Sequence, residues 1–510
     1  MSNETSPLTL TGAPLSIAEV EAVARHARPV ALAPDAARRL AESRAVLDSA
    51  IASGRTLYGV NTGFGSLARE RIGADQLREV QRNLLRSHAA GVGEPLPEET
   101  VRALTLLLAA SLSRGRSGAR PIVVEGLIGL LNAGVTPIVP SVGSVGASGD
   151  LAPLAHAALV LIGEGEARHH GETMTGAAAL ARARLEPIEL AAKEGLALIN
   201  GTHLMAAQAS LALADIDRLI SASICAAAMS IDACRGTDAF LDDRVHALRN
   251  QVGQADAARR IAALIEGSAI IPSHLHDDPR VQDPYSLRCA PVVLGAAMDQ
   301  LRGARAVVER ELGAVTDNPL VFDEPGDADR LVVSAGNFHG MPLAMQMDAT
   351  AIALTTIAGI AERRVYYILA ASDSENPLTP HLSPQPGLHS GLMIVQYTAA
   401  ACVNEMVTLS APACVANIPT SAGMEDYNSF GPRCAAKARR AVELCRHVVA
   451  IELLCAAEAM EYQRPLTSGA GVEAAHALVR SVAPKLMADR PPAPDIAAIG
   501  ALIRDGRFEG

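Results

Sequence analysis

Five long segments from residue 205 onward are expected to be helices, and several of them are apolar on nearly every face, which restricts the possible folds more than any other feature. They are residues 205–235, 286–315, 341–372, 388–411 and 431–462, and each has the length and composition of a long helix. A helix that is hydrophobic all round has to be buried on every side. We therefore expect a mainly α protein whose long helices form a central bundle, packed within one chain and between chains.

The composition favours a large buried core and argues against several kinds of partner. Hydrophobic residues make up 49% of the 510 residues and charged residues only 19%, which is typical of a chain that hides much of its surface in an oligomer. The net charge of −11 is spread along the chain without a basic cluster, so we expect neither nucleic acid nor an anionic membrane as a partner. The uncharged windows 126–149 and 195–214 contain prolines and glycines or the sequence "NGTH", and we interpret them as buried segments rather than membrane spans.

The cysteines and the N-terminus predict a cytoplasmic protein. The eight cysteines lie mostly within apolar helical stretches and form no C-x-x-C pair, as expected of reduced, buried thiols. The first residues lack the basic start and the apolar run of a secretory signal.

The coarse organisation predicts two domains, an N-terminal one over residues 1–205 and a helical one over residues 206–510. In the first, helical periodicity recurs in "QLREVQRNLLRSHAAG", "ETVRALTLLLAASLSRG", "PIVVEGLIGLLNAG" and "DLAPLAHAALVLIGEG". The segment "ARHHGETMTG" predicts a hairpin. The polar, proline-rich stretch 372–387 is expected to be a loop between two long helices, and loops of this length are often functional.

Several short motifs carry little weight. The G-x-G-x-x-A pattern at residues 63–68 lacks a surrounding strand and helix, and "GASGD" has Asp150 in place of the second glycine of a nucleophile elbow. The polar cluster "SHLHDDP", residues 273–279, has side chains that could bind a metal, but such a cluster before a proline is more often a solvated loop. We assign no metal.

The stretch "GSVGASGDLAPLAH" at residues 143–156 suggests a chemistry of its own. Because glycine has no side chain, the amide nitrogen of Gly149 can approach the carbonyl of Ala147 and close a five-membered ring. The hydroxyl of Ser148, between them, can leave as water and turn this residue into a dehydroalanine. The product is a methylene conjugated to an imidazolone, an electrophile built from the chain itself.

This stretch resembles the signature of the aromatic amino acid ammonia-lyase and aminomutase family, which forms a 4-methylidene-imidazol-5-one (MIO) group from Ala-Ser-Gly. Further family-like motifs follow in order over roughly residues 15 to 500: "YGVNTGFG" (58–65), "SHAAGVG" (87–93), "KEGLALINGT" (193–202), "QDPYSLRCAP" (282–291), "TDNPLVF" (316–322), "GNFHG" (336–340) and "IPTSAGMED" (418–426). The resemblance implies an N-terminal domain that carries the MIO group, no external cofactor, and a homotetramer whose active sites are each built from three subunits.

The resemblance also implies roles for individual residues. The catalytic set is Tyr58, Ala147, Ser148, Gly149 and Tyr285, and the set that binds a small amino acid substrate is His88, Asn200, Gln282, Arg288, Phe338 and Glu425. Tyr58 is the expected base, and its surroundings should then favour the phenolate. Arg288 suits the substrate carboxylate because its planar fork can bind two oxygens at once.

Two positions favour histidine as the substrate. Among relatives, the pair Ser-His at 87–88 and a glutamate at 425 are typical of histidine lyases, and a carboxylate holds an imidazole N–H better than an amide does. Three departures near the expected pocket keep other substrates open: Met341 in place of a glutamate, "GMEDY" at 423–427, and the 372–387 loop. Tyrosine or another aromatic amino acid, by elimination or by a 2,3-aminomutase reaction, and a modified histidine are the alternatives.

Two interpretations from other classes also remain. The helical fumarase and aspartase lyases form similar tetramers, but their G-S-S-x-M-P-x-K signature is absent from this chain. A non-catalytic scaffold of the same family would be expected to lack Ser148, Tyr58 or Arg288, and all three are present.

Overall fold

The computed structural model describes residues 6–509, except 64, 66–68, 277, 279, 323–330 and 374–375. Phe64 of the "YGVNTGFG" motif, Asp277 of the polar cluster and part of the 372–387 loop therefore lie outside the described residues. The chain forms two compact units. The first unit comprises Met1–Leu211, Arg305–Met347 and Pro412–Ala436, and the second comprises Ala212–Ala304, Asp348–Ala411 and Lys437–Gly510.

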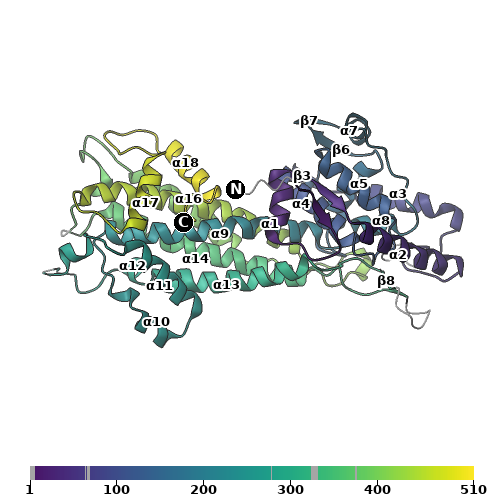
Figure 1. The fold of residues 1–510 in the computed structure, drawn as a ribbon, viewed down its shortest axis with the longest axis horizontal. Helices are drawn as coiled ribbons and strands as arrows, with labels where there is room; N and C mark the ends of the chain where they lie inside the picture. Colours follow the sequence, from purple (N-terminus) through teal and green to yellow (C-terminus); the bar gives the residue numbers. More distant parts are fainter. Residues whose placement is uncertain are drawn as a thin grey trace. The chain divides into compact units, whose positions relative to one another are not determined.

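The five long helices are confirmed. They are α9 (His203–Ala233), α13 (Ala290–Glu311), α14 (Met341–Ala370), α15 (Met393–Leu409) and α16 (Gly431–Met460) (Figure 1). The segment predicted to start at residue 286 is divided, because the short helix α12 (Tyr285–Arg288) ends before α13 begins. Four of these helices contain residues of both units, and the predicted domain boundary at residue 205 lies in one of them, α9.

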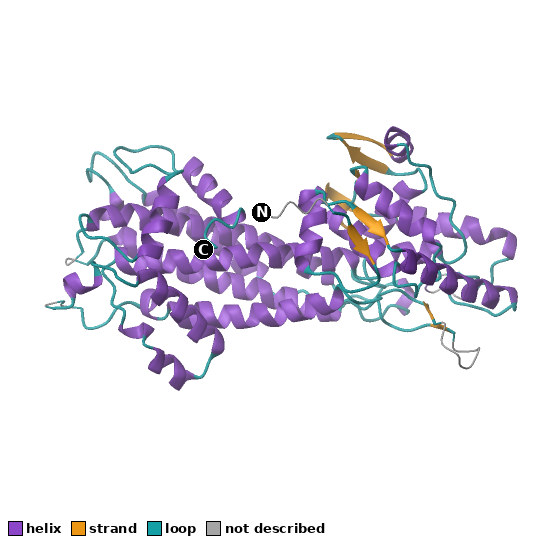
Figure 2. Ribbon diagram, viewed as in Figure 1, coloured by secondary structure: helices purple, strands orange, loops and turns teal. Residues whose placement is uncertain are grey.

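Shorter helices surround a few small sheets in the first unit. The helices are α1 (Ile17–His26), α2 (Pro34–Ala52), α3 (Leu77–His88), α4 (Glu98–Leu112), α5 (Pro121–Asn132), α6 (Leu151–Leu161), α7 (Gly176–Ala183) and α8 (Glu194–Ile199). Four of them, α3 to α6, coincide with the helices expected from the sequence. All strands of the described residues belong to this unit (Figure 2).

The strands pair in four small sheets. A parallel pair joins β1 (Leu8–Leu10) and β2 (Val30–Leu32), and antiparallel pairs join β3 (Val92–Pro95) with β5 (Pro140–Val142) and β8 (Leu320–Val321) with β9 (Val332–Val333). The fourth sheet has the order β4 (Val135–Pro137), β6 (Glu166–His169), β7 (Glu172–Thr175). The last two strands form the hairpin expected at "ARHHGETMTG", with His170 and Gly171 at positive φ in its turn.

The second unit adds short helices to its parts of the long ones. They are α10 (Asp243–Arg249), α11 (Val252–Ile265), α12, α17 (Ala470–Arg480) and α18 (Ala493–Arg504). Two buried ion pairs lie inside this unit: Arg364 with Glu452, and Lys437 with Asp348. Such pairing is what permits charged side chains in so apolar a core.

One helix among the described residues, α14, is long and apolar enough to cross a membrane. Its most apolar stretch is 56% buried within the protein. The core helices of bundles outside membranes can be equally long and apolar. All eight cysteines are free thiols, six of them buried.

Candidate active site

The Ala147-Ser148-Gly149 turn is held in a conformation that requires glycine. Gly146, Ser148 and Gly149 all have positive φ, at 78°, 50° and 82°. A Cβ on Gly149 would lie 2.1 Å from the carbonyl oxygen of Gly201, where no heavy atom fits. The two chain segments are joined by hydrogen bonds from Gly201 N to Ser148 O (3.0 Å) and from Asp150 N to Gly201 O (2.8 Å).

These contacts fit the ring closure expected from the sequence. Ser144 donates its hydroxyl to the carbonyl of Gly149 and accepts the amide of Gly146, which closes the loop on itself. A tight turn with a non-glycine residue at positive φ is a strained arrangement that surrounding contacts have to impose. The backbone of Ala147 to Gly149 is thus already bent into a tight turn, with no side chain on Gly149 to keep its nitrogen away from Ala147.

Asp150, directly after the turn, connects the turn to the start of α9. Its fully buried carboxylate accepts the backbone N–H groups of Leu204 (2.8 Å) and Met205 (3.1 Å), two of the unpaired donors of the first helical turn. Burial raises the pKa of this carboxyl to about 7, although these hydrogen bonds oppose the shift. The sequence motifs gave Asp150 no role: it directly precedes α6, whose first turn its side chain does not cap, and its contact with α9 arises only in the fold.

Asn200 lies beside the turn and holds one unsatisfied acceptor. It is 2% exposed and immediately precedes Gly201. Its Nδ2 donates to Asp317 Oδ1 (3.2 Å) and to the carbonyl of Asn318 (2.9 Å), whereas its Oδ1 has no hydrogen-bond partner. A buried acceptor without a donor costs about 1 to 3 kcal/mol. The atom therefore fits a donor that a bound group would bring, as expected for a residue next to the prosthetic group and the substrate.

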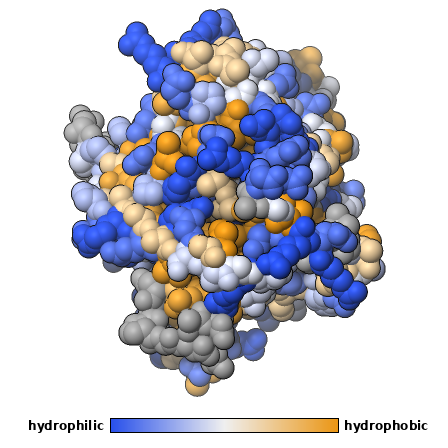
Figure 3. All heavy atoms as spheres, turned by 90° about the vertical axis from the view of Figure 1, so that its right-hand side faces the viewer, coloured by the Kyte–Doolittle hydropathy of each residue, from blue (hydrophilic) through white to orange (hydrophobic). Residues whose placement is uncertain are grey.

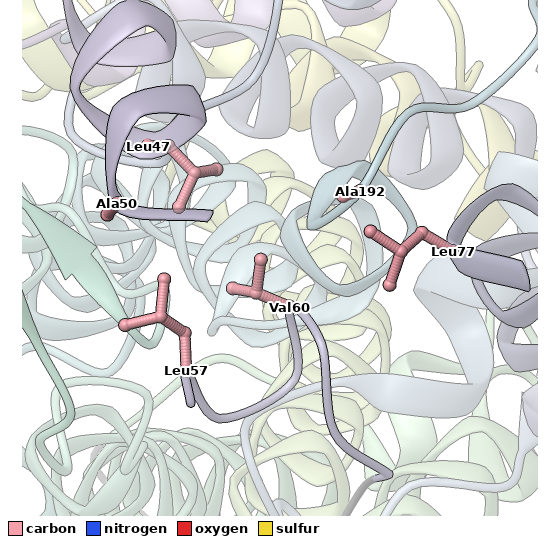
Figure 4. Packing of buried hydrophobic residues seen from close by; sticks show 6 residues of the cluster. All are labelled: Leu47, Ala50, Leu57, Val60, Leu77 and Ala192. Carbon is pink, nitrogen blue, oxygen red and sulfur yellow. The ribbon is translucent and has the colours of Figure 1, made fainter. Parts of the chain in front are cut away.

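Tyr58 is positioned by a rigid loop. Leu57 and Val60, on either side of it, belong to a buried cluster with Leu47, Ala50, Leu77 and Ala192 (Figure 4). The Asn61 side chain accepts the Leu57 N–H (2.7 Å) and donates to the carbonyl of Arg55 (2.7 Å), so it joins the backbone before Tyr58 to the backbone after it. The Tyr58 hydroxyl accepts the Gly65 N–H at 3.2 Å.

Four of the predicted residues line one cavity of about 480 Å³ in the first unit. Its lining includes Tyr58, Ser148, His88 and Glu425. Apolar side chains, among them Leu84, Leu151, Leu196 and Ile199, supply much of the rest. A cavity with apolar walls and a few polar groups is the usual form of a small-molecule site. The face of this unit near α2 and α3 shows apolar areas between charged and polar side chains (Figure 3).

His88 and Glu425 present hydrogen-bond acceptors in this cavity. The Nδ1 atom of His88 is 2.9 Å from the carbonyl of Leu84, so it carries the proton and leaves Nε2 as the acceptor of the neutral ring. Burial lowers the pKa of His88, while the bond to Leu84 and the charge of Glu425 oppose this. Glu425 is held by its own loop: Thr420 donates its hydroxyl to Glu425 Oε2 (2.7 Å), and the backbones of these two residues pair. Sequence reasoning missed Thr420, which lies in the quoted "IPTSAGMED" motif.

Phe338 lies in a turn before α14 and is half-buried. Gly340, two residues later, and Gly146 both approach the Ser429 hydroxyl, since a Cβ on them would lie 3.2 and 2.2 Å from it. The "GNFHG" segment, which contains Phe338, and the Ala-Ser-Gly loop therefore both lie next to Ser429.

The other three predicted residues form a cluster in the second unit. Arg288 donates to Gln282 Oε1 (2.7 Å) and to the carbonyl of Asp283 (2.9 Å), and its guanidinium lies 4.7 Å from the centre of the Tyr285 ring. Tyr285 is 70% exposed, and Gln282 is exposed as well. Within the described residues, no group of three or more His, Cys, Asp or Glu side chains is arranged to hold a metal ion.

Comparison with known proteins identifies the family of this chain. Residues 15–481 match the family described as aromatic amino acid lyase. The chain belongs to this family. It is therefore a lyase, as the motifs predicted.

Its relatives and structural neighbours include enzymes of more than one reaction type. A histidine ammonia-lyase from Sorangium cellulosum is 49% identical over 501 residues, which cover 98% of this chain and 97% of that protein. The crystal structure of a histidine ammonia-lyase from Trypanosoma cruzi superposes with a TM-score of 0.90 at 36% identity, covering 99% of this chain and 94% of that one. A tyrosine aminomutase from Streptomyces globisporus gives a TM-score of 0.92 at 33% identity, covering 99% and 98%.

Proposed function

We propose that this lyase eliminates ammonia from L-histidine to give trans-urocanate, with an MIO group formed from Ala147, Ser148 and Gly149. The observation that carries the proposal is the single cavity that brings Ser148 and Tyr58 together with two acceptors, His88 and Glu425. The 49% identity to a histidine ammonia-lyase over nearly the whole chain supports the same substrate.

The two acceptors match an imidazole. A protonated imidazole carries two N–H donors, and Glu425 and His88 Nε2 can each accept one of them. A tyrosine phenol has one O–H and cannot donate to both acceptors. Because the Glu425 carboxylate is charged, its hydrogen bond to the ring is stronger than a neutral one.

The chain's residues would then divide the reaction between them. An MIO group formed from Ala147, Ser148 and Gly149 would supply an electrophile for the substrate's amino group, which would make the amine a better leaving group. Tyr58 removes the β-proton, and the Gly65 N–H keeps its oxygen in place. The apolar wall formed by Leu84, Leu196 and Ile199 keeps water away from the reacting carbons.

The cluster of Gln282, Tyr285 and Arg288 would bind the substrate carboxylate and complete the active site in a neighbouring subunit. The exposure of Tyr285 and Gln282 supports this, since both are available to another copy. The Gln282 contact and the stacking on Tyr285 hold the Arg288 fork in one orientation, which is what two-point binding of a carboxylate needs.

A homotetramer is supported by an apolar stripe along α14. Met345, Ile352 and Tyr366 are 57%, 44% and 53% exposed, and their positions in the sequence differ by multiples of seven. Gly359 continues this spacing, and a Cβ there would meet no atom within 4 Å. Apolar residues at heptad spacing on an open helix face are typical of helix packing between chains. The free thiols of the eight cysteines support a reducing, cytoplasmic location.

The second candidate is a tyrosine aminomutase or lyase, favoured by the departures at 423–427. Met424 and Tyr427 are 66% and 60% exposed, so the side chains of both departing residues are available to a substrate or to another chain. The Tyr427 ring stacks against His339, at a centroid distance of 6.3 Å, and its carbonyl is 3.1 Å from His339 Nε2.

An ultraviolet assay for conjugated acid products decides between these substrates. L-Histidine, L-tyrosine, L-phenylalanine and histidine betaine are offered separately to the wild-type enzyme and to the Ser148→Ala variant. We expect urocanate from histidine and no product from the variant, because its turn cannot form the dehydroalanine. A product from another substrate with histidine inert would show that the departures at 341, 424 and 427 changed the specificity, and normal turnover by the variant would refute the prosthetic group.

A further inference from the structure

A buried chain of hydrogen bonds leads from a lysine to Asn200. Lys193 is 0% exposed, and its Nζ lies 2.6 Å from Asp317 Oδ2. The other oxygen of Asp317 accepts Asn200 Nδ2 at 3.2 Å and the backbone N–H of Asn318 at 2.6 Å. Burial lowers the pKa of Lys193, and the neighbouring Asp317 opposes this shift. The lysine and the aspartate lie in the motifs "KEGLALINGT" and "TDNPLVF", neither of which had explained them.

These hydrogen bonds determine which end of the Asn200 amide faces Asp317 and Asn318. An amide can turn over and exchange its NH₂ and its oxygen at almost no cost unless its partners distinguish them. The carboxylate oxygen of Asp317 and the carbonyl of Asn318 act as acceptors here, so both select the NH₂ of Asn200. Asn200 Oδ1 therefore points away from Asp317 and Asn318, and it is buried without a hydrogen-bond partner.

We propose that Lys193 and Asp317 are positioning residues that hold Asn200 with its Oδ1 as an acceptor for the substrate's amino group. Lys193 donates to Asp317 and holds its carboxylate in place, and Asp317 in turn keeps the Asn200 amide in one orientation. The inference rests on the proposed function, in which the substrate's amino group brings the missing donor to this position.

A buried ion pair could instead serve stability alone, and the test has to separate the two roles. Removing one partner would leave an uncompensated charge and destabilise the protein for that reason. The double variant Lys193→Met/Asp317→Asn leaves no such charge, but the new amide at position 317 can present either an acceptor or a donor to Asn200. A matched control is Lys437→Met/Asp348→Asn, which removes another buried Lys–Asp pair whose lysine donates to Asp348 and to the Ala411 carbonyl.

The experiment measures kcat and KM for L-histidine, thermal stability, and the mass of the chain, which is lower by two water molecules once the MIO group has formed. For the Lys193 and Asp317 double variant we expect the two waters to be lost as in wild type, and kcat to fall by roughly 10- to 100-fold, the worth of a hydrogen bond to a charged group. KM should change less than kcat, and the control should keep the wild-type kcat.

Asp317→Glu provides a second test that keeps the ion pair, in case the double variant does not assemble. Its carboxylate is moved by one methylene away from the position that Asn200 requires, so kcat should fall while the melting temperature stays near that of the wild type. Wild-type kcat in the folded variants, or a loss no larger than in the control, would overturn the proposal. A variant that fails to lose the two waters would overturn it as well, by placing the effect on ring formation. Wild-type enzyme inert towards every amino acid would instead refute the proposed function.

Discussion

Replacement of Gly149 by alanine tests whether the close contact at the turn, rather than glycine's flexibility alone, holds the site together. The positive φ of 82° costs an alanine about 1 to 2 kcal/mol. The added Cβ would also lie 2.1 Å from the carbonyl oxygen of Gly201, and this neighbour is backbone, so no side chain can rotate away. The two segments have to separate, which breaks the hydrogen bonds of Gly201 N to Ser148 O and of Asp150 N to Gly201 O. At about 1 kcal/mol each, or more when buried groups stay unpaired, the total destabilisation is about 3 to 6 kcal/mol.

Gly171 offers a matched control for this variant. Its φ of 81° is almost the same, but a Cβ there would meet no atom within 4 Å. Gly171→Ala should therefore show the backbone cost alone, about 1 to 2 kcal/mol. The assay is urea unfolding followed by circular dichroism at one protein concentration, together with the mass of each chain. Equal destabilisation of the two variants, or loss of two waters by Gly149→Ala, would refute the reasoning.

Three further predictions concern two residues of the cavity, Glu425 and Tyr58, and the buried Asp150. Glu425→Gln replaces a charged acceptor by a neutral one, so kcat/KM for histidine should fall by roughly 5- to 30-fold, or about 1 to 2 kcal/mol, and that for tyrosine by less; equal losses in parallel assays would remove the argument for the imidazole. Tyr58→Phe removes the proposed base and should lower kcat by about 100- to 10,000-fold without unfolding the protein, and a kcat near the wild-type value would assign the proton transfer to another group. Burial raises the pKa of Asp150 from 3.8 to about 7, so the folded state keeps a proton that the unfolded state has released. The free energy of unfolding should consequently decrease between pH 4 and pH 7, by about 1.4 kcal/mol per pH unit from this group, and Asp150→Asn should remove that slope in urea titrations.

The long helices could be predicted from the sequence because their apolar residues leave no alternative to burial. Each of the five was found within a few residues of its expected bounds. The break between α12 and α13 was not foreseen, although Pro291, the second residue of α13, is typical of the first turn of a helix and marks a new helix start there. Periodicity describes which side chains are buried, but it does not show where one helix is divided into two.

The candidate active-site residues were predicted from motifs, whereas the contacts around them required the structure. Spacing in the sequence cannot show that Gly201 approaches Gly149, because the two are brought together only by the fold. The same holds for Asp317, which is more than a hundred residues from Asn200 and fixes its orientation. Gln282, Tyr285 and Arg288 were assigned by resemblance, and their proposed role in the substrate site stays a prediction.

The most direct measurement is the amount of ammonia and of urocanate released from L-histidine by the wild-type enzyme. We predict both products in a one-to-one ratio, because a lyase lets the amine leave after the β-proton has been removed. Release of neither product, or conversion of an aromatic amino acid to its β-isomer without free ammonia, would contradict the account.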